Sequence, residues 1–409
     1  MCMRCLQMSR RGLLVGGGVL AAAGAAGGAQ ARVRPADMVP LIGPGYRPTD
    51  IDERGMWQQM DRVEEEIAGS NLLLKDPQLT GYLRDLIGSV GGPAAKDMRI
   101  YLARVPEFNA MMFPTGFAVV FTGLLLRMRN EAQLAGVIAH ESGHFLRKHQ
   151  IRSWRDTKRK SDLFAIGSLA LAGAGAAGGF YAGDVAQLAQ LGTIMSLFQY
   201  SRAMEAEADA MGARLLAEQN YPAAEMATTW QQLIGEEEAS ARYRRKHRDR
   251  GFSLFRTHPS PESRMADLRI TAAEVTTPGR TYDDRRARYM QAIGPVRHML
   301  LDDQVKLNDP GASQYLVEML ARDGWDGSLR YFEAEVWRLR NRAGDQERAA
   351  LGYAAAVAYP DAPADAWRWH GLSLMKQGRQ AEGRNALSHY LKMKPDAPDA
   401  PFMRQMIGA

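Results

Sequence analysis

The sequence predicts a mainly α-helical protein with a small β-sheet, in which TPR-like helical repeats follow a larger catalytic region. Three observations support this fold class. Apolar residues recur at helical spacing in several stretches. Two short apolar segments with strand character, 98–102 and 117–121, lie close together. In the last third, glycine, aromatic and small residues recur at the 34-residue spacing of tetratricopeptide repeats.

Charge argues against nucleic-acid binding, and cysteine content argues against a metal site built on thiolates. The 409 residues allow two or three domains. The chain has 52 basic and 46 acidic side chains, but residues 1–31 hold three arginines and no acid, so the remainder has 49 against 46. This near balance gives no case for nucleic acid as a partner. Cys2 and Cys5 are the only cysteines, so a processed chain would bind metal through His and carboxylate alone.

Residues 1–31 have the order of a signal peptide. Arg10 and Arg11 precede an uncharged run rich in Gly, Ala, Leu and Val, which ends at Ala29-Gln30-Ala31. A basic region, an apolar region and an A-x-A site predict export, with a twin-arginine character. We expect cleavage near Ala31 and a periplasmic location. An uncleaved anchor and a cytosolic terminus are the alternatives.

The next stretches predict a linker and two helices. Residues 32–49 are rich in Pro and Gly and are expected to be a linker. Residues 51–67 are predicted to be helical. Asp76-Pro77 supplies an N-cap and a first-turn proline for a second helix, which Gly91-Gly92-Pro93 ends.

The stretch His140-Glu141-Ser142-Gly143-His144 lies on a predicted helix. Asn130 is a suitable N-cap, and Gln133 stands where a capping box has Glu or Gln. A rotation of about 100° per residue places His140 and His144 on one face, one turn apart. Two such imidazoles can share one Zn²⁺, and Glu141 can reach a water on the same metal. Two solvated histidines are the alternative, so a third ligand is needed.

A second helix, predicted over 199–212, offers that ligand. Glu205, Asp209 and Gly212 share one face, whereas Glu207 points about 200° away from Glu205. Glu205 would give a carboxylate to zinc, and Asp209 would accept a hydrogen bond from a ligand N–H. Gly212 would permit a close helix contact. On spacing alone, an exposed acidic helix fits equally well.

The apolar run Phe117-Ala118-Val119-Val120-Phe121 follows a turn at Pro114-Thr115-Gly116 and precedes the metal helix. A buried core strand is one interpretation. The other, which we adopt, is an edge strand whose free backbone groups pair with an extended peptide substrate.

Two stretches leave several interpretations open. Residues 163–183 lack charge but are dominated by Gly and Ala. A mobile segment over the active site is favoured over a membrane-surface or re-entrant element and over a true span. Residues 242–250 form the strongest positive run. They are expected to be an exposed loop, with contact to an anionic membrane surface as the alternative.

The C-terminal third predicts two helix–turn–helix repeats, 330–363 and 364–398. Gly378 lies 34 residues after Gly344, and a chance pair of helical hairpins is the alternative. Because such arrays generally need three or more repeats, region 311–329 or the catalytic domain is expected to supply the missing packing surface.

Taken together, these motifs resemble the HtpX and CAAX-prenyl-protease group of zinc metallopeptidases, of the gluzincin type. The resemblance implies a zincin-type catalytic domain with His140, His144 and Glu205 as ligands of one Zn²⁺ per chain, and Glu141 as catalytic base. It does not imply Glu207 as a ligand. The matching stretches, in chain order, are Asn109–Gly116 with the strand after it, His140–His144, Ser201-Arg202 with Glu205–Asp209, and Thr257-His258-Pro259 with Arg264.

The roles of the residues around the three candidate ligands are less clearly indicated. Asp209 and Arg202 are expected to support the ligands from behind. His149 lies about 180° from His140 on an extended helix and is left outside the site. Three interpretations of His258 stay open. It is a loop histidine at a helix start, or a fourth zinc ligand that would make the enzyme latent, or a donor to the developing oxyanion.

The expected order is a signal peptide over 1–31, a linker over 32–49, a zinc metallopeptidase domain over 50–280, a helical connector over 281–328 and TPR-like repeats over 329–409. The expected function is exported zinc-dependent hydrolysis of unfolded or misassembled envelope proteins. The resemblance implies envelope protein-assembly partners for the repeats, beside the peptide substrate. A non-proteolytic chaperone or assembly scaffold is the alternative from another class, and an integral-membrane protease is the second.

Overall fold

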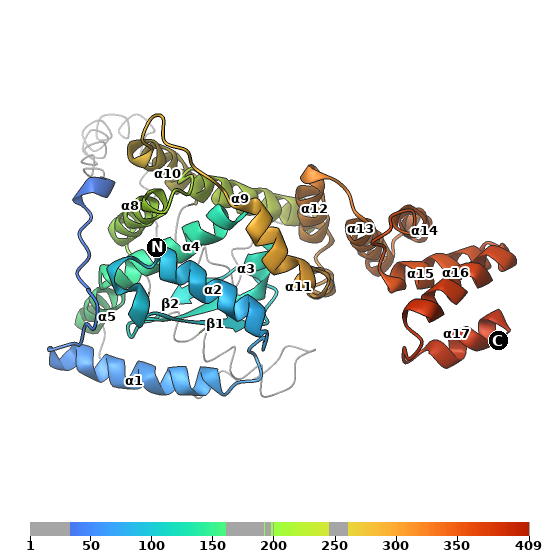
Figure 1. Ribbon diagram of the computed structural model, residues 1–409, viewed down its shortest axis with the longest axis horizontal. Coiled ribbons are helices and arrows are strands. Elements are labelled where there is room, and N and C mark those ends of the chain that lie inside the picture. Colours follow the sequence, from blue (N-terminus) through green and yellow to red (C-terminus); the bar gives the residue numbers. More distant parts are fainter. Residues whose placement is uncertain (1–32, 161–191, 193–197, 199, 245–260, 409) are drawn as a thin grey trace, which may run out of the picture. The chain divides into compact units, whose positions relative to one another are not determined.

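Helices and one three-stranded sheet form the part of the protein that the computed structural model describes, residues 33–160, 192, 198, 200–244 and 261–408 (Figure 1). This confirms the predicted fold class. Within these residues, no helix is both long and apolar enough to cross a membrane. The signal segment, the uncharged stretch 163–183 and His258 lie outside the described residues.

The sheet has the order β1-β3-β2, with β1 spanning Arg99–Ala103, β2 Ala110–Met112 and β3 Phe117–Phe121. β3 pairs in parallel with β1 and antiparallel with β2. The prediction that Phe117–Phe121 is an edge strand is therefore wrong. All five of its residues are buried, because a continuous apolar run suits a strand that is covered on both faces and both edges. The strand that was not predicted, β2, lies at the edge.

The predicted turn between these strands is present. Gly116 has φ 87°, its N–H donates to the Phe113 carbonyl at 2.9 Å, and the Phe113 N–H donates to the Phe117 carbonyl at 2.8 Å. A positive φ suits glycine, which has no Cβ to clash. The turn therefore folds β2 back along β3.

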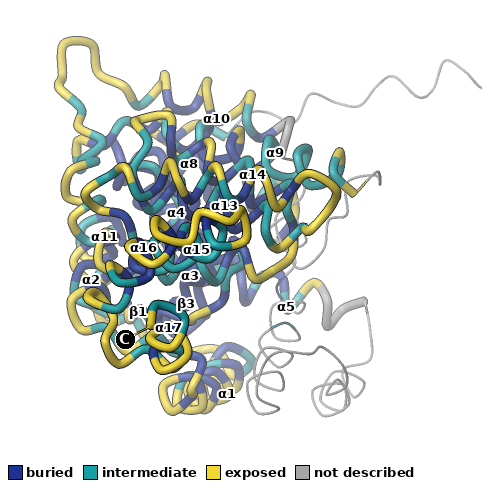
Figure 2. The backbone as a smooth tube through the Cα atoms, turned by 90° about the vertical axis from the view of Figure 1, so that its right-hand side faces the viewer, coloured by how far each residue is buried: buried dark blue, intermediate teal, exposed yellow. Residues whose placement is uncertain are grey.

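The metal helix α4 (Glu131–Leu146) lies between β2 and helix α8 (Arg202–Glu218) (Figure 1). Its N-cap is as predicted, because the Asn130 side chain accepts from Gln133 N at 2.9 Å. The Gln133 side chain in turn accepts from Arg129 N at 2.8 Å. All residues of α4 except Val137 are buried, as the tube coloured by burial shows (Figure 2). Such burial is unsuited to the alternative of solvated histidines.

Two glycines let α4 and α8 approach closely. A Cβ on Gly143 would lie 3.0 Å from the Ala208 carbonyl oxygen. One on Gly212 would lie 3.1 Å from the His140 backbone nitrogen, in agreement with the close contact predicted there. Side chains at either position would separate the helices. The glycines thus set the distance between the two halves of the site.

Helices α1 (Ile51–Ala68) and α2 (Pro77–Val90) agree with the predictions. Each has an aspartate cap: Asp50 accepts from Asp52 N and Glu53 N, and Asp76 accepts from Leu79 N at 2.9 Å. Short elements complete this region: η1 (Pro35–Asp37), η2 (Gly92–Asp97), α3 (Thr122–Arg127) and α5 (His149–Lys160).

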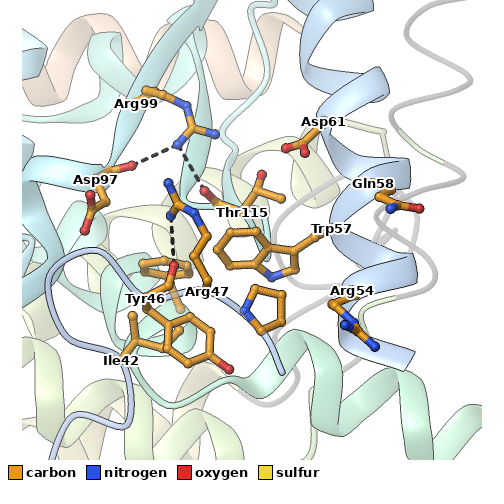
Figure 3. A pocket seen from close by; sticks show the side chains of 12 residues that line it. Ile42, Tyr46, Arg47, Arg54, Trp57, Gln58, Asp61, Asp97, Arg99 and Thr115 are labelled. Atoms are coloured by element: carbon orange, nitrogen blue, oxygen red, sulfur yellow. Dashed lines mark hydrogen bonds between the residues drawn. The ribbon is translucent and has the colours of Figure 1, made fainter. Parts of the chain in front are cut away.

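The predicted linker is in part a strap, residues 38–46, bound to the folded core. The Leu41 N–H donates to the Leu146 carbonyl at 2.8 Å, and the Gly45 N–H donates to Asp97 Oδ2 at 2.7 Å. Side chains alternate along it, with Met38 and Ile42 buried and Val39 and Leu41 exposed. A pocket of about 430 Å³ lies between the strap, α1 and the start of β1, and Figure 3 shows the side chains that line it.

Three helices follow α8 and precede the hairpins: α9 (Glu225–Arg244), α10 (Pro261–Val275) and α11 (Arg286–Lys306). Helix α12 (Pro310–Leu320) packs against α9, and the short turn η5 (Ala321–Asp323) follows it. Helix α11 contacts α2, α3 and α4. It is therefore part of the packing around the metal helix.

Two helical hairpins occupy the predicted repeats, α13 (Gly327–Arg340) with α14 (Asp345–Ala356), and α15 (Ala364–Lys376) with α16 (Gln380–Met393). Gly344 and Gly378 have φ 80° and 83° in the corresponding turns. Helix α12 packs against α13, and α17 (Ala400–Ile407) packs against α16. These two flanking helices cover faces that a pair of repeats would otherwise expose.

Candidate metal centre

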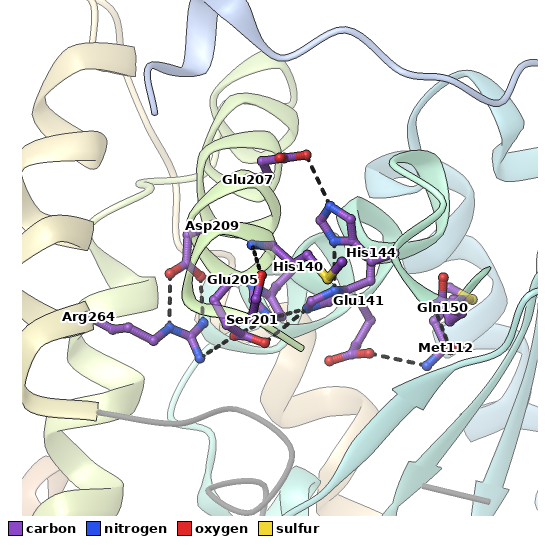
Figure 4. Close-up of polar contacts among 12 residues, drawn as sticks. Met112, His140, Glu141, His144, Gln150, Ser201, Glu205, Glu207, Asp209 and Arg264 are labelled. Carbon is purple, nitrogen blue, oxygen red and sulfur yellow. Dashed lines mark hydrogen bonds and ion pairs between the residues drawn. The ribbon is translucent and has the colours of Figure 1, made fainter. Parts of the chain in front are cut away.

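The structure brings the three predicted ligands together. The candidate ligand atoms of His140, His144 and Glu205 all lie within 4.8 Å of one another, and all three residues are buried. The two Nε2 atoms are 3.0 Å apart, and each lies 3.6 Å from a Glu205 carboxylate oxygen (Figure 4). No other cluster of this kind is found in the described residues. With 2% of its side chain exposed, Glu205 does not belong to an exposed acidic helix.

These donors fit Zn²⁺. Two imidazoles and one carboxylate are a donor set of catalytic zinc sites, which keep a fourth position open. A ligating imidazole is neutral and needs a partner for its other nitrogen. Each ring has one, because His140 Nδ1 lies 2.9 Å from Asp209 Oδ1, and His144 Nδ1 lies 2.9 Å from His149 Nδ1.

The structure places Asp209 beside His140 and Arg264 beside Asp209. Arg264 on α10 donates to both Asp209 oxygens, at 3.0 and 2.7 Å, and lies 2.7 Å from Glu205 Oε2. Burial opposes ionisation of Asp209, but Arg264 and His140 outweigh it and hold the pKa of Asp209 below its usual value. The pKa of Arg264 is raised by the same carboxylates, against burial.

Arg202 does not have the predicted supporting place. It is the first residue of α8 and is exposed, and Arg264 makes the contacts that were expected of it. Arg264 belongs to one of the motifs that carried the resemblance. However, residue spacing cannot place two side chains from different helices beside each other, so no pattern in the sequence indicated this role for Arg264.

His149 was left outside the site, but it contacts a ligand. Besides its contact with His144, its Nε2 lies 3.1 Å from Glu207 Oε2. The rotation argument failed because α4 ends at Leu146 and Lys148 has φ 57°, so the chain turns before α5 begins. Burial lowers the pKa of His149, against the effect of Glu207. As predicted, Glu207 is not in the ligand group.

Glu141 lies beside the edge strand. Its Oε2 accepts from the Met112 N–H at 3.2 Å, while Gln150 Nε2 donates to the Met112 carbonyl at 2.9 Å. Both backbone groups of Met112 therefore bind side chains outside the sheet, those of Glu141 and Gln150 (Figure 4). Tyr200 stacks on His144 with ring centroids 3.8 Å apart. The Glu141 carboxylate, the candidate metal site and the edge of the sheet are thus close together.

Residues 73–272 match the family model described as Peptidase family M48. The match confirms the resemblance to zinc metallopeptidases and covers every residue of the cluster. It also includes residues 245–260, so it extends over His258, whose place is not described.

Three relatives show how far the similarity extends. The beta-barrel assembly-enhancing protease of Escherichia coli K12 is 31% identical over 226 residues, which are 53% of this chain and 44% of that protein. The mitochondrial metalloendopeptidase OMA1 of Schizosaccharomyces pombe is 25% identical over 195 residues, 48% of this chain and 52% of that protein. Metalloprotease LoiP of E. coli is 29% identical over 173 residues, 42% of this chain and 60% of that protein. The chain thus spans about half the length of these relatives.

Proposed function

We propose that this protein is an exported zinc-dependent endopeptidase that cleaves extended segments of unfolded or misassembled envelope proteins. The observation that carries the proposal is the convergence of His140, His144 and Glu205 beside Glu141 and the edge strand β2. The match of residues 73–272 to family M48 supports peptide hydrolysis. The name of the E. coli relative, an assembly-enhancing protease, supports envelope proteins as substrates.

The roles of the side chains follow from their positions. When bound by His140, His144 and Glu205, Zn²⁺ supplies a Lewis acid for the scissile carbonyl and for the attacking water. Glu141 accepts the proton of that water and delivers it to the leaving nitrogen. Asp209 keeps the His140 ring oriented. The Met112 N–H holds one Glu141 oxygen close to the edge of the sheet.

We assign substrate binding to β2 in place of Phe117–Phe121. In the register with β3, Ala110 and Met112 direct their backbone groups away from the sheet. An extended peptide can pair with the groups of Ala110, because Glu141 and Gln150 already bind those of Met112. A folded chain offers no free strand for such pairing. The enzyme would therefore select unfolded segments.

Export and partner binding rest on the sequence. The order of residues 1–31 supports a periplasmic location, and the hairpins offer surfaces for envelope protein-assembly partners. Membrane-surface contact through 242–250 has weaker support, because Arg244 lies at the end of α9 and pairs with Asp309 at 2.6 Å. The prediction for 163–183 stays untested, and alkaline extraction of membranes would separate a peripheral protein from a spanning one.

Replacing Glu141 by Gln tests the function directly. The Glu141→Gln protein should bind one Zn²⁺ per chain and cleave an unfolded protein about 10²–10⁴-fold more slowly, because the amide cannot accept the proton. Metal content and cleavage rate are the two measurements.

The matched control is Glu65→Gln on the exposed face of α1, which should cleave at the wild-type rate. Undiminished cleavage by Glu141→Gln would contradict the mechanism. If the wild-type chain binds unfolded proteins and prevents their aggregation but never cleaves them, the scaffold function that the hairpins suggest is favoured instead.

A further inference from the structure

The two ligand histidines are supported in different ways. His140 Nδ1 contacts a carboxylate directly, Asp209. His144 Nδ1 contacts a second imidazole, His149, and only that imidazole contacts a carboxylate, Glu207. His144 and His149 are each fully covered. A ligand supported through a second histidine depends on a longer chain of contacts.

The contacts allow one order of protons. A ligating His144 directs the lone pair of Nε2 to the metal, so its proton is on Nδ1 and is donated to His149 Nδ1. His149 then carries its proton on Nε2, 3.1 Å from Glu207 Oε2, and donates it there. Each imidazole nitrogen between the metal and Glu207 is thus either a donor or an acceptor, and no two donors face each other. The ring of His144 is thereby held in the orientation that a ligand needs.

Glu207 is itself held by arginines that follow the metal helix. Arg147 Nε lies 2.9 Å and Arg152 Nη1 3.1 Å from its Oε2. Three groups, the His149 ring and the two guanidinium groups, thus meet at this one oxygen. The acceptor at the end of the chain is therefore a carboxylate.

Arg147 also joins this chain of contacts to the strap. Its Nη1 donates to the Val39 carbonyl at 2.7 Å, while the neighbouring Leu41 N–H donates to the Leu146 carbonyl. Arg214 donates to the Met38 carbonyl. Because Val39 and Leu41 are 62% and 51% exposed, the strap is bound here by its backbone and by the buried side chains beside them.

We propose that Arg147, Glu207 and His149 form a positioning chain that orients the metal ligand His144, and that the strap is its outer anchor. These residues are outside the candidate ligand group, and they act through His144. The inference rests on the metal site of the proposed function. It assigns a role in metal binding to an N-terminal segment that the sequence presents as a linker.

Zinc affinity tests the positioning chain. In the full chain, His149→Phe and Glu207→Gln should weaken zinc binding about 10–100-fold, the range for lost outer partners of metal ligands. Arg147→Gln should also weaken it, whereas Arg147→Lys, which keeps a cation beside Glu207, should restore part of the loss. The measurements are chelator competition for Zn²⁺ and the visible spectrum of the Co²⁺-loaded protein, which reports ligand geometry.

Two controls separate positioning from general damage. Arg155→Gln removes a cation of α5 that contacts Asp50 at 2.6 Å, outside the strap and away from Glu207, so zinc affinity and the Co²⁺ spectrum should not change even if the unfolding temperature falls. For the strap, Ile42→Ser should weaken zinc binding and Leu41→Ser should not, because only Ile42 is buried.

The outcomes are distinct. Wild-type zinc affinity in His149→Phe, Glu207→Gln and Arg147→Gln overturns the positioning chain while leaving the peptidase intact. An equal loss in Arg155→Gln also overturns it, because the effect is then one of stability. Unchanged affinity in Ile42→Ser removes the strap from the proposal. If the wild-type chain binds no zinc at all, the proposed function itself fails.

Discussion

At the scale of single residues, Arg264 contacts two carboxylates with different tasks. Glu205 is the third candidate ligand, and Asp209 accepts from His140. All are buried, and the Arg264 guanidinium also lies over the Trp230 ring, 4.6 Å from its centroid. Without a cation nearby, two carboxylates at such depth would repel each other and would be poorly solvated.

Replacing Arg264 should therefore destabilise the metal-free protein strongly. Arg264→Leu should lower the free energy of unfolding by about 3–5 kcal/mol, the range for removing one partner of a buried ion pair. Zinc should recover part of this loss, because the metal places positive charge beside Glu205. The measurement is urea unfolding with and without zinc.

The exposed Arg269 lies on the same helix and is the control, since Arg269→Leu should change stability by less than about 0.5 kcal/mol. A loss in Arg264→Leu that is no larger than in the control would contradict the role of the buried arginine. So would a loss that zinc leaves untouched.

The ligands could be predicted from the sequence because each relation lies within one helix. His140 and His144 are one turn apart on α4, and Glu205 and Asp209 are one turn apart on α8. His149 could not be placed, because the helix on which the rotation was counted ends before it. Contacts between helices have no signature in spacing, and so Arg202 was chosen where Arg264 lies.

At the scale of elements, the close packing of α4 and α8 brings the ligands together, and this predicts the effect of a single methyl group. Gly212→Ala places a Cβ 3.1 Å from the His140 nitrogen. We expect a loss of about 1–3 kcal/mol in stability from overpacking. Zinc affinity should fall too, since the displaced helix carries Glu205. Urea unfolding and chelator competition measure the two effects.

Gly81 on α2 offers a matched comparison, because a Cβ there would meet nothing within 4 Å. Gly81→Ala should be neutral, or stabilising by up to about 1 kcal/mol, as alanine in a helix generally is. If Gly212→Ala behaves like Gly81→Ala, the glycine does not set the distance between the helices.

The turn between α13 and α14 gives a prediction that depends on pH. The hydrogen bond from Arg340 lowers the pKa of Asp345 to about 2, with help from the Arg342 N–H. The folded state keeps this carboxylate ionised to lower pH than the unfolded chain does. Its contribution is therefore complete above about pH 4 and is lost as the pH falls toward 2. Asp345→Asn should destabilise the protein by about 1 kcal/mol at pH 7, and less at pH 3, in urea unfolding.

An exposed pair in the second hairpin, Arg379 with Glu382, shows what a surface ion pair contributes. Glu382→Gln should leave unfolding unchanged at both pH values. A difference between wild type and Asp345→Asn that grows on acidification would have the wrong sign for the shifted pKa.

Strand order was the part of the fold that the sequence could not supply. An apolar run such as 117–121 indicates burial, but the same run suits a covered edge and a central strand. The true edge, β2, has three residues, too few for an alternating pattern to appear. The helices and hairpins were predictable because their caps, glycine turns and apolar periods are local.

At the scale of the whole molecule, the connector is packed onto the catalytic region. Tyr289 on α11 is 1% exposed and donates to the Leu125 carbonyl. Gln304, also on α11, accepts from Arg127 at 2.9 Å. Arg288 pairs with the fully covered Glu131 at the start of α4, at 2.9 Å. The metal helix therefore has part of its cover from residues beyond 280.

This packing predicts where the chain can be shortened. A chain ending at residue 280 would expose the apolar faces of α3 and α4 and leave Glu131 without its α11 partner, so it should lose cooperative unfolding and zinc binding. A chain ending at Gly324 keeps α11, α12 and the pairing of Asp323 with Arg129 at 2.8 Å, so it should fold and bind one Zn²⁺. Urea unfolding and metal content of both chains are the measurements.

Zinc binding by the chain ending at 280 would show that the peptidase domain is complete without α11, in agreement with the predicted domain boundaries of 50–280. Failure of both chains would mean that the hairpins, too, are needed for the catalytic region to fold.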